Sequence, residues 1–88
     1  MNSNEYATHD LYLSSFLMTQ GQFKLKAIRD NGNGRKIFVF EPKPDHSVIL
    51  EFYNGEAKVS AIKLLESLST LKSATYVLNN RKGEYNAD

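Results

Sequence analysis

The stretch Lys24-Leu25-Lys26-Ala27-Ile28-Arg29-Asp30-Asn31-Gly32-Asn33-Gly34-Arg35-Lys36 decides how the middle of this chain folds. The residues at its centre, 31–34, are Asn and Gly, which readily adopt the positive φ angles of tight turns. Runs of strand-forming residues flank this centre on both sides. The stretch therefore predicts a β-hairpin with a loop at residues 31–34, which would place Lys24 opposite Glu41.

The predicted hairpin has apolar side chains on both faces, because side chains alternate along a strand. Two strands alone are marginal in water, so we expect either helices on both faces or contact with another chain, including a second copy. One face carries Phe23, Leu25, Ala27, Phe38 and Phe40. The other face carries the candidate self-association residues Ile28, Ile37 and Val39, rimmed by Lys24, Lys26 and Arg35.

The same hairpin concentrates positive charge. Five of the eleven basic residues lie in it beside one acid, Asp30, so its local charge is near +4 in a chain of net charge +1. Such cations can bind phosphates, but lysines on strands also protect sheet edges from unwanted pairing. A pI near 8.0 and the lack of a recognised nucleic-acid-binding signature favour the second interpretation. The candidate nucleic-acid-binding residues are Lys24, Lys26, Arg29, Arg35 and Lys36.

Two short helices are predicted, one before and one after the hairpin. Thr8 or Asp10 can cap the first, which is largely apolar and ends near Gly21. Asp45 can cap the second, which the sequence Asn54-Gly55 would close. An extended structure for residues 47–53 is the alternative, because Val, Ile, Phe and Tyr favour strands.

The longest predicted helix begins after Ser60, which can cap it. Its apolar residues recur at intervals of three and four, which places them along one helix face. We expect this stripe to pack on the Phe23 face of the hairpin, and the alternative is a seam between two copies. The stripe consists of Ala61, Leu64, Leu68, Leu71, Thr75 and Leu78, and Leu65 widens it.

Length and composition indicate one small globular domain. The 88 residues suffice for a thin core, and a hydrophobic content of 41% is ordinary for such a domain. We expect a single domain over residues 1–88, ordered over about 6–80, with a polar tail at 81–88. The expected fold class is α+β, with a short N-terminal helix, a β-hairpin, a second helix and a long C-terminal helix packed on the hairpin.

Several chemistries are disfavoured. Without cysteine, the chain has no disulfide, thiolate nucleophile or thiolate zinc site. His9-Asp10 and Asp45-His46 lie at predicted helix starts, where Asp serves as a cap, so we expect no metal and no cofactor. No nucleophile elbow or phosphate-binding loop occurs, so we expect no enzyme and assign no catalytic residue. The lack of a signal peptide or membrane-length apolar run predicts a cytoplasmic protein without a membrane partner.

Four short motifs occur in order along the chain: Asp10-Leu11-Tyr12-Leu13-Ser14-Ser15-Phe16-Leu17, then Ile37-Phe38-Val39-Phe40-Glu41, then Phe52-Tyr53-Asn54-Gly55, then Leu71-Lys72-Ser73. Over roughly residues 8–78 they resemble a family of small bacterial and phage proteins catalogued as a domain of unknown function. Its members share the patterns DLxLAxFL, FVFE, FYNG and LKS; here Ser14 and Ser15 replace alanines. The resemblance implies a compact α+β unit found near mobile elements, and no activity or site residue.

The expected function is that of a non-enzymatic protein-interaction or oligomerisation module. Its partner is another protein or a second copy, and the resemblance implies a role linked to a mobile element. The alternative is a nucleic-acid-binding module that uses the basic hairpin. A continuous positive surface would favour the alternative, whereas cations interrupted by acids such as Asp30 and Glu41 would favour protein interaction.

Overall fold

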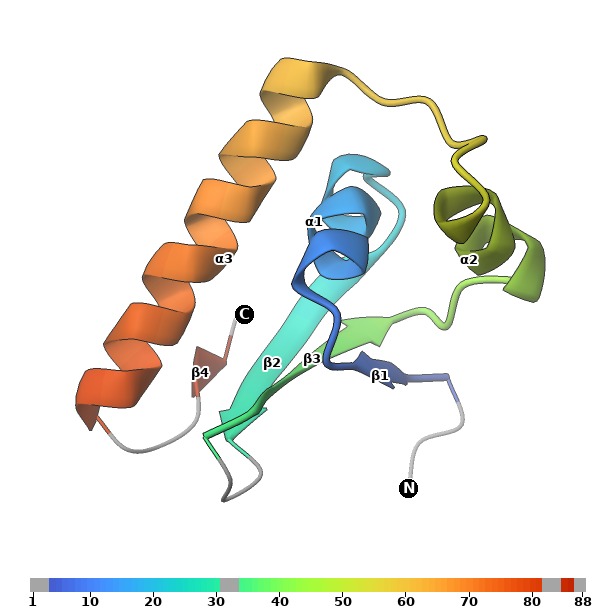
Figure 1. Cartoon of the computed structure of the whole chain (residues 1–88). Helices are drawn as coiled ribbons and strands as arrows, with labels where there is room; N and C mark the ends of the chain where they lie inside the picture. Colours follow the sequence, from blue (N-terminus) through green and yellow to red (C-terminus); the bar gives the residue numbers. More distant parts are fainter. Residues whose placement is uncertain (1–3, 31–33, 82–84, 87–88) are drawn as a thin grey trace.

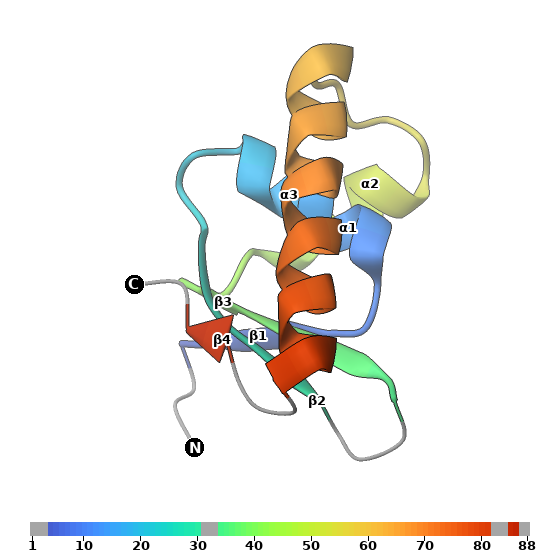
Figure 2. The same ribbon diagram turned by 90° about the vertical axis from the view of Figure 1, so that its left-hand side faces the viewer.

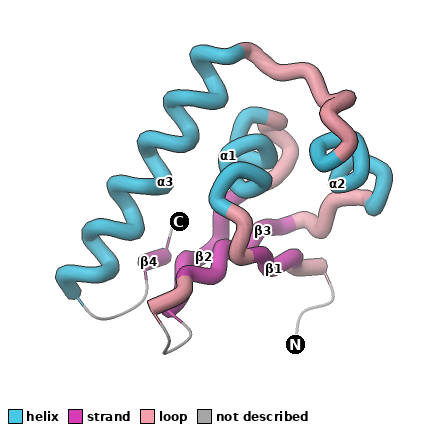
Figure 3. The backbone as a smooth tube through the Cα atoms, viewed as in Figure 1, coloured by secondary structure: helices cyan, strands magenta, loops and turns pink. Residues whose placement is uncertain are grey.

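The computed structural model of the chain describes residues 4–30, 34–81 and 85–86. Along this part of the chain lie β1 (Tyr6–Thr8), α1 (Leu11–Thr19), β2 (Lys24–Asp30), β3 (Lys36–Glu41), α2 (His46–Tyr53), α3 (Ala61–Arg81) and β4 (Tyr85–Asn86). The strands form one antiparallel sheet in the order β1-β3-β2-β4. All three helices cover one face of this sheet and leave the other face bare (Figures 1 and 3). The predicted α+β fold class is confirmed.

Helix α1 lies at the centre of the helical layer, between α3 and α2 (Figure 1). Of the two predicted caps, Thr8 and Asp10, it is Asp10 that begins the helix: its Oδ1 accepts hydrogen bonds from the backbone N–H groups of Tyr12 at 2.9 Å and Leu13 at 3.1 Å. Gly21, with a φ of 77°, turns the chain away after the helix. The helix is buried on most of its surface, as its apolar sequence predicts.

Two adjacent serines are buried in α1. Ser14 and Ser15 are 0% and 1% exposed. The Ser14 hydroxyl donates to the carbonyl of Asp10 at 2.8 Å, and the Ser15 hydroxyl donates to the carbonyl of Leu11 at 2.9 Å. Such bonds to the preceding helical turn satisfy a buried hydroxyl. Among the described residues, no buried side-chain polar atom is left without a hydrogen-bond partner.

The core lies between α1, the covered face of the sheet and the middle of α3. Helix α3 contributes Leu71, which is fully buried, and Ala74. Helix α3 packs mainly on α1 and less on the hairpin (Figure 2). The predicted packing of its stripe on the hairpin is therefore confirmed only in part, through Leu71 in the shared core. The core consists of Leu13, Phe16, Leu17, Phe23, Ile28, Phe38, Phe40, Leu71 and Ala74.

The pairing of β2 with β3 departs from the predicted register. Lys24 lies opposite Glu41 as predicted, but an irregularity between Leu25 and Ala27 shifts the following pairs by one residue. A β-bulge of this kind moves the residues beyond it to the opposite face. Ile28 therefore lies on the covered face and is 0% exposed, so its predicted place on the outer face is wrong.

The face of the sheet on which no helix lies still buries two apolar side chains. Ala27 lies opposite Val39 there, and both are nearly buried, with 3% and 4% of their surface exposed. The predicted place of Ala27 on the core face is therefore also wrong. Of the three candidate self-association residues, Ile28 is in the core, Val39 is buried and Ile37 is half-buried. They do not form one exposed apolar patch.

Both ends of the described chain add strands that the sequence did not predict. Strand β1 pairs with β3, and Tyr6 packs against the core. Strand β4 pairs with β2 at Ala27 and Ile28. Helix α3 ends at Arg81, and β4 lies within the predicted polar tail at 81–88. Residues 31–33 of the predicted loop, and 82–84 and 87–88 of the predicted tail, lie outside the described residues.

Helix α2 confirms the predicted helix over the extended alternative. It ends at Asn54, followed by Gly55 with a φ of 75°. Asp45 precedes it without making a side-chain capping bond, and no residue of this fully described helix is buried. The Phe52 ring stacks on Phe16 of α1 with 5.2 Å between ring centroids. No described helix, α3 included, is long and apolar enough to cross a membrane.

Candidate interaction surfaces

The outer side of the helical layer carries an apolar surface around a hollow. The hollow has a volume of about 330 Å³ and opens between α1, α2 and the first half of α3. Tyr12 and Leu65 stand at its rim and are 64% and 62% exposed. The hollow is lined by Tyr12, Ser15, Phe52, Leu64, Leu65 and Leu68.

Two further exposed side chains extend this surface. Ile62 precedes Leu65 by three residues on α3, which places it on the neighbouring turn, and it is 69% exposed. Tyr53 follows the hollow-lining Phe52 on α2 and is 56% exposed. Single exposed apolar residues are ordinary, but a group around one hollow is typical of a contact surface. We call Tyr12, Tyr53, Ile62 and Leu65 the helix-side patch.

The sequence did not single out this patch. It predicted that Leu65 widens the buried stripe of α3, and this prediction is wrong. Leu64, Leu68 and Leu71 turn toward the layer beneath, and Leu65 points about 100° away from Leu64 because each helical residue advances by that angle. Only the position of α1 beneath α3 decides which of these residues stay exposed.

A hydrogen bond between two helices fixes one wall of the hollow. The Tyr53 hydroxyl donates to Oδ2 of Asp10 at 2.6 Å, while the other oxygen of this carboxylate caps α1. This bond, with lesser contributions from burial and the negative charge of Asp10, raises the pKa of Tyr53 from 10.0 to about 12. One carboxylate therefore begins α1 and also holds the end of α2 against it.

Acids interrupt the basic residues of the hairpin. Nζ of Lys26 lies 3.6 Å from Oε1 of Glu41, and Nζ of Lys36 lies 3.2 Å from Oδ2 of Asp30. The Lys36 side chain is only 12% exposed, so little of it is available to a phosphate. Two of the five candidate nucleic-acid-binding residues are therefore occupied in ion pairs within the sheet.

The remaining three candidates lie at two ends of the hairpin. Arg29 and Arg35 are exposed near the loop, whereas Lys24 is exposed at the beginning of β2. The separation of Lys24 from Arg29 along the strand is about 17 Å, at roughly 3.3 Å per residue. The side chains of Arg81 and Lys82, two further cations of the sequence, lie outside the described part of the chain.

The histidines and carboxylates form no metal-binding group in the described residues, where no three such side chains are suitably clustered. Nδ1 of His9 instead lies 3.1 Å from the backbone carbonyl oxygen of Lys36. A protonated Nδ1 would donate this hydrogen bond and tie the segment before α1 to the start of β3. His9 and Asp10 thus have structural contacts that differ from those of a metal site.

Comparison with known proteins identifies the family. No curated protein and no solved structure matches this chain. The family match covers residues 3–77, which includes all four motifs and every element from β1 into the second half of α3. The chain belongs to the family described as "Domain of unknown function (DUF5659)".

Proposed function

We propose that this chain is a non-enzymatic protein-interaction module that forms a dimer with a second copy through the helix-side patch. One observation carries the proposal. Tyr12 and Leu65, which are 64 and 62% exposed, stand at the rim of one apolar hollow, and Ile62, which is 69% exposed, lies one helical turn from Leu65 on α3. Burial of such side chains against a partner removes apolar surface from water and is favourable.

The patch has the complementarity that a symmetric dimer requires. In a two-fold interface, the same surface of each copy must fit itself. Here each copy offers both projecting side chains, such as Leu65, and a hollow of about 330 Å³ that can receive one. The net charge of +1 gives two copies little reason to repel each other. These features support a second copy as the occupant.

The nucleic-acid alternative has less support. Lys26 and Lys36 are paired with Glu41 and Asp30, and Lys24 lies far from the loop cations. Binding by such a surface would be mainly electrostatic and would weaken steeply with salt. A fluorescence anisotropy titration with DNA and RNA at low salt tests the alternative. Tight binding that Arg35→Ala weakens would favour it over the dimer.

Sedimentation equilibrium tests the dimer directly. The wild type should move from the monomer mass of 10.0 kDa toward twice that mass as its concentration rises through the micromolar range. Leu65→Lys places a charge at the patch centre and should weaken dimerisation by about tenfold or more, as loss of a central contact does. Circular dichroism should show an unchanged fold, because Leu65 is exposed.

Tyr76→Lys provides the matched control. Tyr76 is also an exposed apolar residue of α3, 67% exposed, but it lies about 16 Å along the helix from Leu65. The Tyr76→Lys variant should therefore leave the dimer intact. An equal effect of both variants would indicate a seam along α3 and contradict the patch, and a wild type that stays monomeric at several hundred micromolar would refute self-association.

The cellular setting rests on the family resemblance alone. It supports the proposal that this module is an accessory protein of a bacterial or phage mobile element and acts in the cytoplasm. Crosslinking in cells that carry such an element, followed by identification of the crosslinked chains, tests this. Recovery of the chain crosslinked to itself is the expected result.

A further inference from the structure

The hollow of the helix-side patch, here called the patch hollow, has two unlike walls. One wall is aromatic and consists of Tyr12 on α1 and Phe52 on α2. The other wall is aliphatic and consists of Leu64, Leu65 and Leu68 of α3. The volume of about 330 Å³ lies at the small end of the range for sites that bind small molecules. The size of the hollow therefore suits a ligand of one or two rings.

The aromatic wall is held in place before any ligand binds. The Phe52 ring stacks on Phe16 with 5.2 Å between ring centroids, and the Tyr53 ring meets it edge-on at 5.3 Å. The Tyr53 hydroxyl in turn donates to the Asp10 carboxylate. A ring that is already fixed on two sides loses little further freedom when another ring packs on it, and aromatic rings pack favourably on each other.

The polar groups of the patch hollow are bonded or lie at its rim. Of the described residues that line it, only Tyr12 and Ser15 carry a polar side-chain atom. The Ser15 hydroxyl is buried and donates to the carbonyl of Leu11 at 2.9 Å, and Tyr12 stands at the rim. A charged or strongly polar ligand would lose its bonds to water in this hollow without gaining others. The lining therefore favours an uncharged aromatic molecule.

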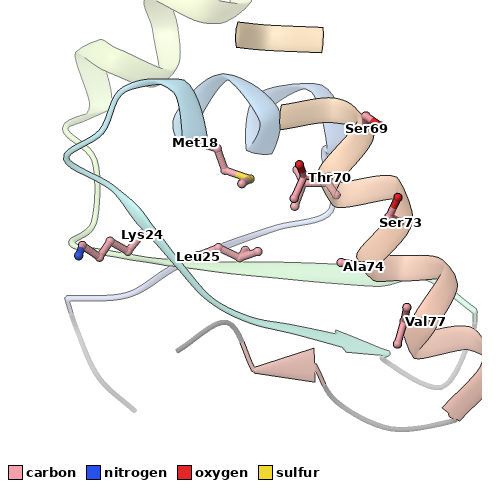
Figure 4. Close-up of a pocket in the computed structure, with 9 residues that line it drawn as sticks. Met18, Lys24, Leu25, Ser69, Thr70, Ser73, Ala74 and Val77 are labelled. Atoms are coloured by element: carbon pink, nitrogen blue, oxygen red, sulfur yellow. The ribbon is translucent and has the colours of Figure 1, made fainter. Parts of the chain in front are cut away.

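A second hollow of the same chain provides a comparison. It lies between the start of β2 and the second half of α3 and has a volume of about 730 Å³. Figure 4 shows the hydroxyl-bearing Ser69, Thr70 and Ser73 on α3, and Lys24 and Leu25 on β2. Because this larger hollow mixes hydroxyls and an ammonium group with its apolar residues, it fits an uncharged ring less well than the patch hollow does.

We propose that the patch hollow binds a small uncharged aromatic molecule, and that this ligand displaces the second copy of the chain. The ring of the ligand lies between Phe52 and the leucines of α3, and a neutral polar substituent stays at the rim beside Tyr12. The displacement rests on the proposed dimer, in which a side chain of the partner enters the same hollow. Binding of the ligand itself does not depend on the dimer.

Indole is the probe, because the chain contains no tryptophan and the fluorescence of indole can be followed without that background. Ile62→Lys supplies a monomer with an intact hollow, since Ile62 belongs to the patch but is not among the residues that line the hollow. Indole should saturate this variant, and the wild type at low concentration, with a dissociation constant of about 1 mM or below. The methyl NMR signals of Leu64 and Leu68 should shift with the same constant, whereas those of Leu25 in the second hollow should not.

Purine is the matched control ligand, because it has the two-ring shape of indole but carries nitrogen acceptors around its edge. Purine should bind at least about tenfold more weakly, since those acceptors lose water without gaining a donor. Phe52→Leu removes the aromatic wall and should weaken indole binding by about threefold or more. Tyr76→Leu removes an exposed ring of α3 that does not line the hollow and should not change it. Circular dichroism checks that both variants fold.

Sedimentation equilibrium tests the displacement. Indole should move the wild type toward the monomer mass of 10.0 kDa, and purine should not. Equal binding of indole and purine, or equal shifts at Leu25 and Leu68, would show non-specific association and overturn the binding site. Indole binding that leaves a dimeric wild type dimeric would overturn the displacement. A wild type that is monomeric throughout would refute the dimer and the displacement with it, while the indole titration still decides whether the hollow binds the ligand.

Discussion

Helices α1 and α2 have similar local sequence signals but lie in different surroundings. Each follows an aspartate, has a short apolar run and is followed by a glycine with positive φ. Yet α1 has five buried residues, and α2 has none. The Asp10 carboxylate caps α1, whereas Asp45 makes no side-chain capping bond with α2.

The difference shows that local sequence signals predict where a helix forms but not which other elements pack against it. Helix α1 is enclosed by the sheet and by the other two helices, so its side chains supply the core. Helix α2 packs the partly buried Val48, Ile49 and Phe52 against the core, and its Phe52 ring and Tyr53 hydroxyl contact α1. It serves as a wall of the patch hollow and contributes little to the core.

The largest predicted difference is in the cost of truncating a leucine. Leu17→Ala on α1 should lower the free energy of unfolding by about 2–5 kcal/mol, because Leu17 is fully buried and its removal leaves a cavity. Leu50→Ala on α2 should lower it by about 0.5 kcal/mol or less, because Leu50 is 45% exposed. Urea denaturation measures both. Similar losses for the two variants would mean that α2 is as much part of the core as α1.

Replacement of the two aspartates by alanine should change the free energy of unfolding by amounts that differ less than those for the two leucines. Asp10→Ala removes the cap of α1 and the acceptor of the Tyr53 hydroxyl, and should destabilise the fold by about 1–2 kcal/mol. Asp45→Ala should change stability by within about 0.5 kcal/mol. Asp10→Asn, which keeps an acceptor oxygen, is the matched control and should recover part of the loss. A larger effect at Asp45 than at Asp10 would contradict the capping difference.

The smallest predicted effect on stability concerns the hydrogen bond from Tyr53 to Asp10, which joins α2 to α1. The raised pKa of Tyr53 means that the folded chain holds this proton more tightly than the unfolded chain, whose tyrosine has a pKa near 10.0. The stabilisation is therefore fully present below pH 10 and is lost as the pH rises through about 12. Because the pair is solvent-exposed, Tyr53→Phe should cost less than about 1 kcal/mol at neutral pH.

Tyrosinate absorbance provides the measurement. The difference between the titrations of the wild type and Tyr53→Phe should be a single step with its midpoint near pH 12. Tyr76→Phe is the control, because this residue lies on α3, away from Asp10, and its removal should leave that step in place. A Tyr53 step near pH 10 would show that the bond to Asp10 is absent in solution.

The faces of the hairpin illustrate the limit of prediction from this sequence. Alternation assigns faces only while both strands stay regular, and the bulge after Leu25 reverses the assignment of Ala27 and Ile28. The run Phe38-Val39-Phe40 is apolar on both sides and therefore does not reveal the reversal. Helices cover one face only, so the larger Ile28 occupies the core, and Ala27 is left on the bare face.

The candidate sites were predictable to different degrees. Charge alone identified the cations of the hairpin, but their pairing with Asp30 and Glu41 depends on the register. No sequence pattern indicated the helix-side patch. Leu65 lies among leucines whose spacing assigned them to the core. Exposed aromatic and aliphatic residues on three helices become a site only when the fold brings them around one hollow.

The sequence by itself determined the three helices, the hairpin and the family of this chain. Caps, glycines and apolar spacing act over a few residues, so they can be read without knowing the rest of the fold. The tertiary structure decided the bulge, the strands β1 and β4, and the exposure of Leu65. These depend on contacts between segments far apart in the chain: a strand of two or three residues has no stability of its own and exists because β2 and β3 offer edges to pair with.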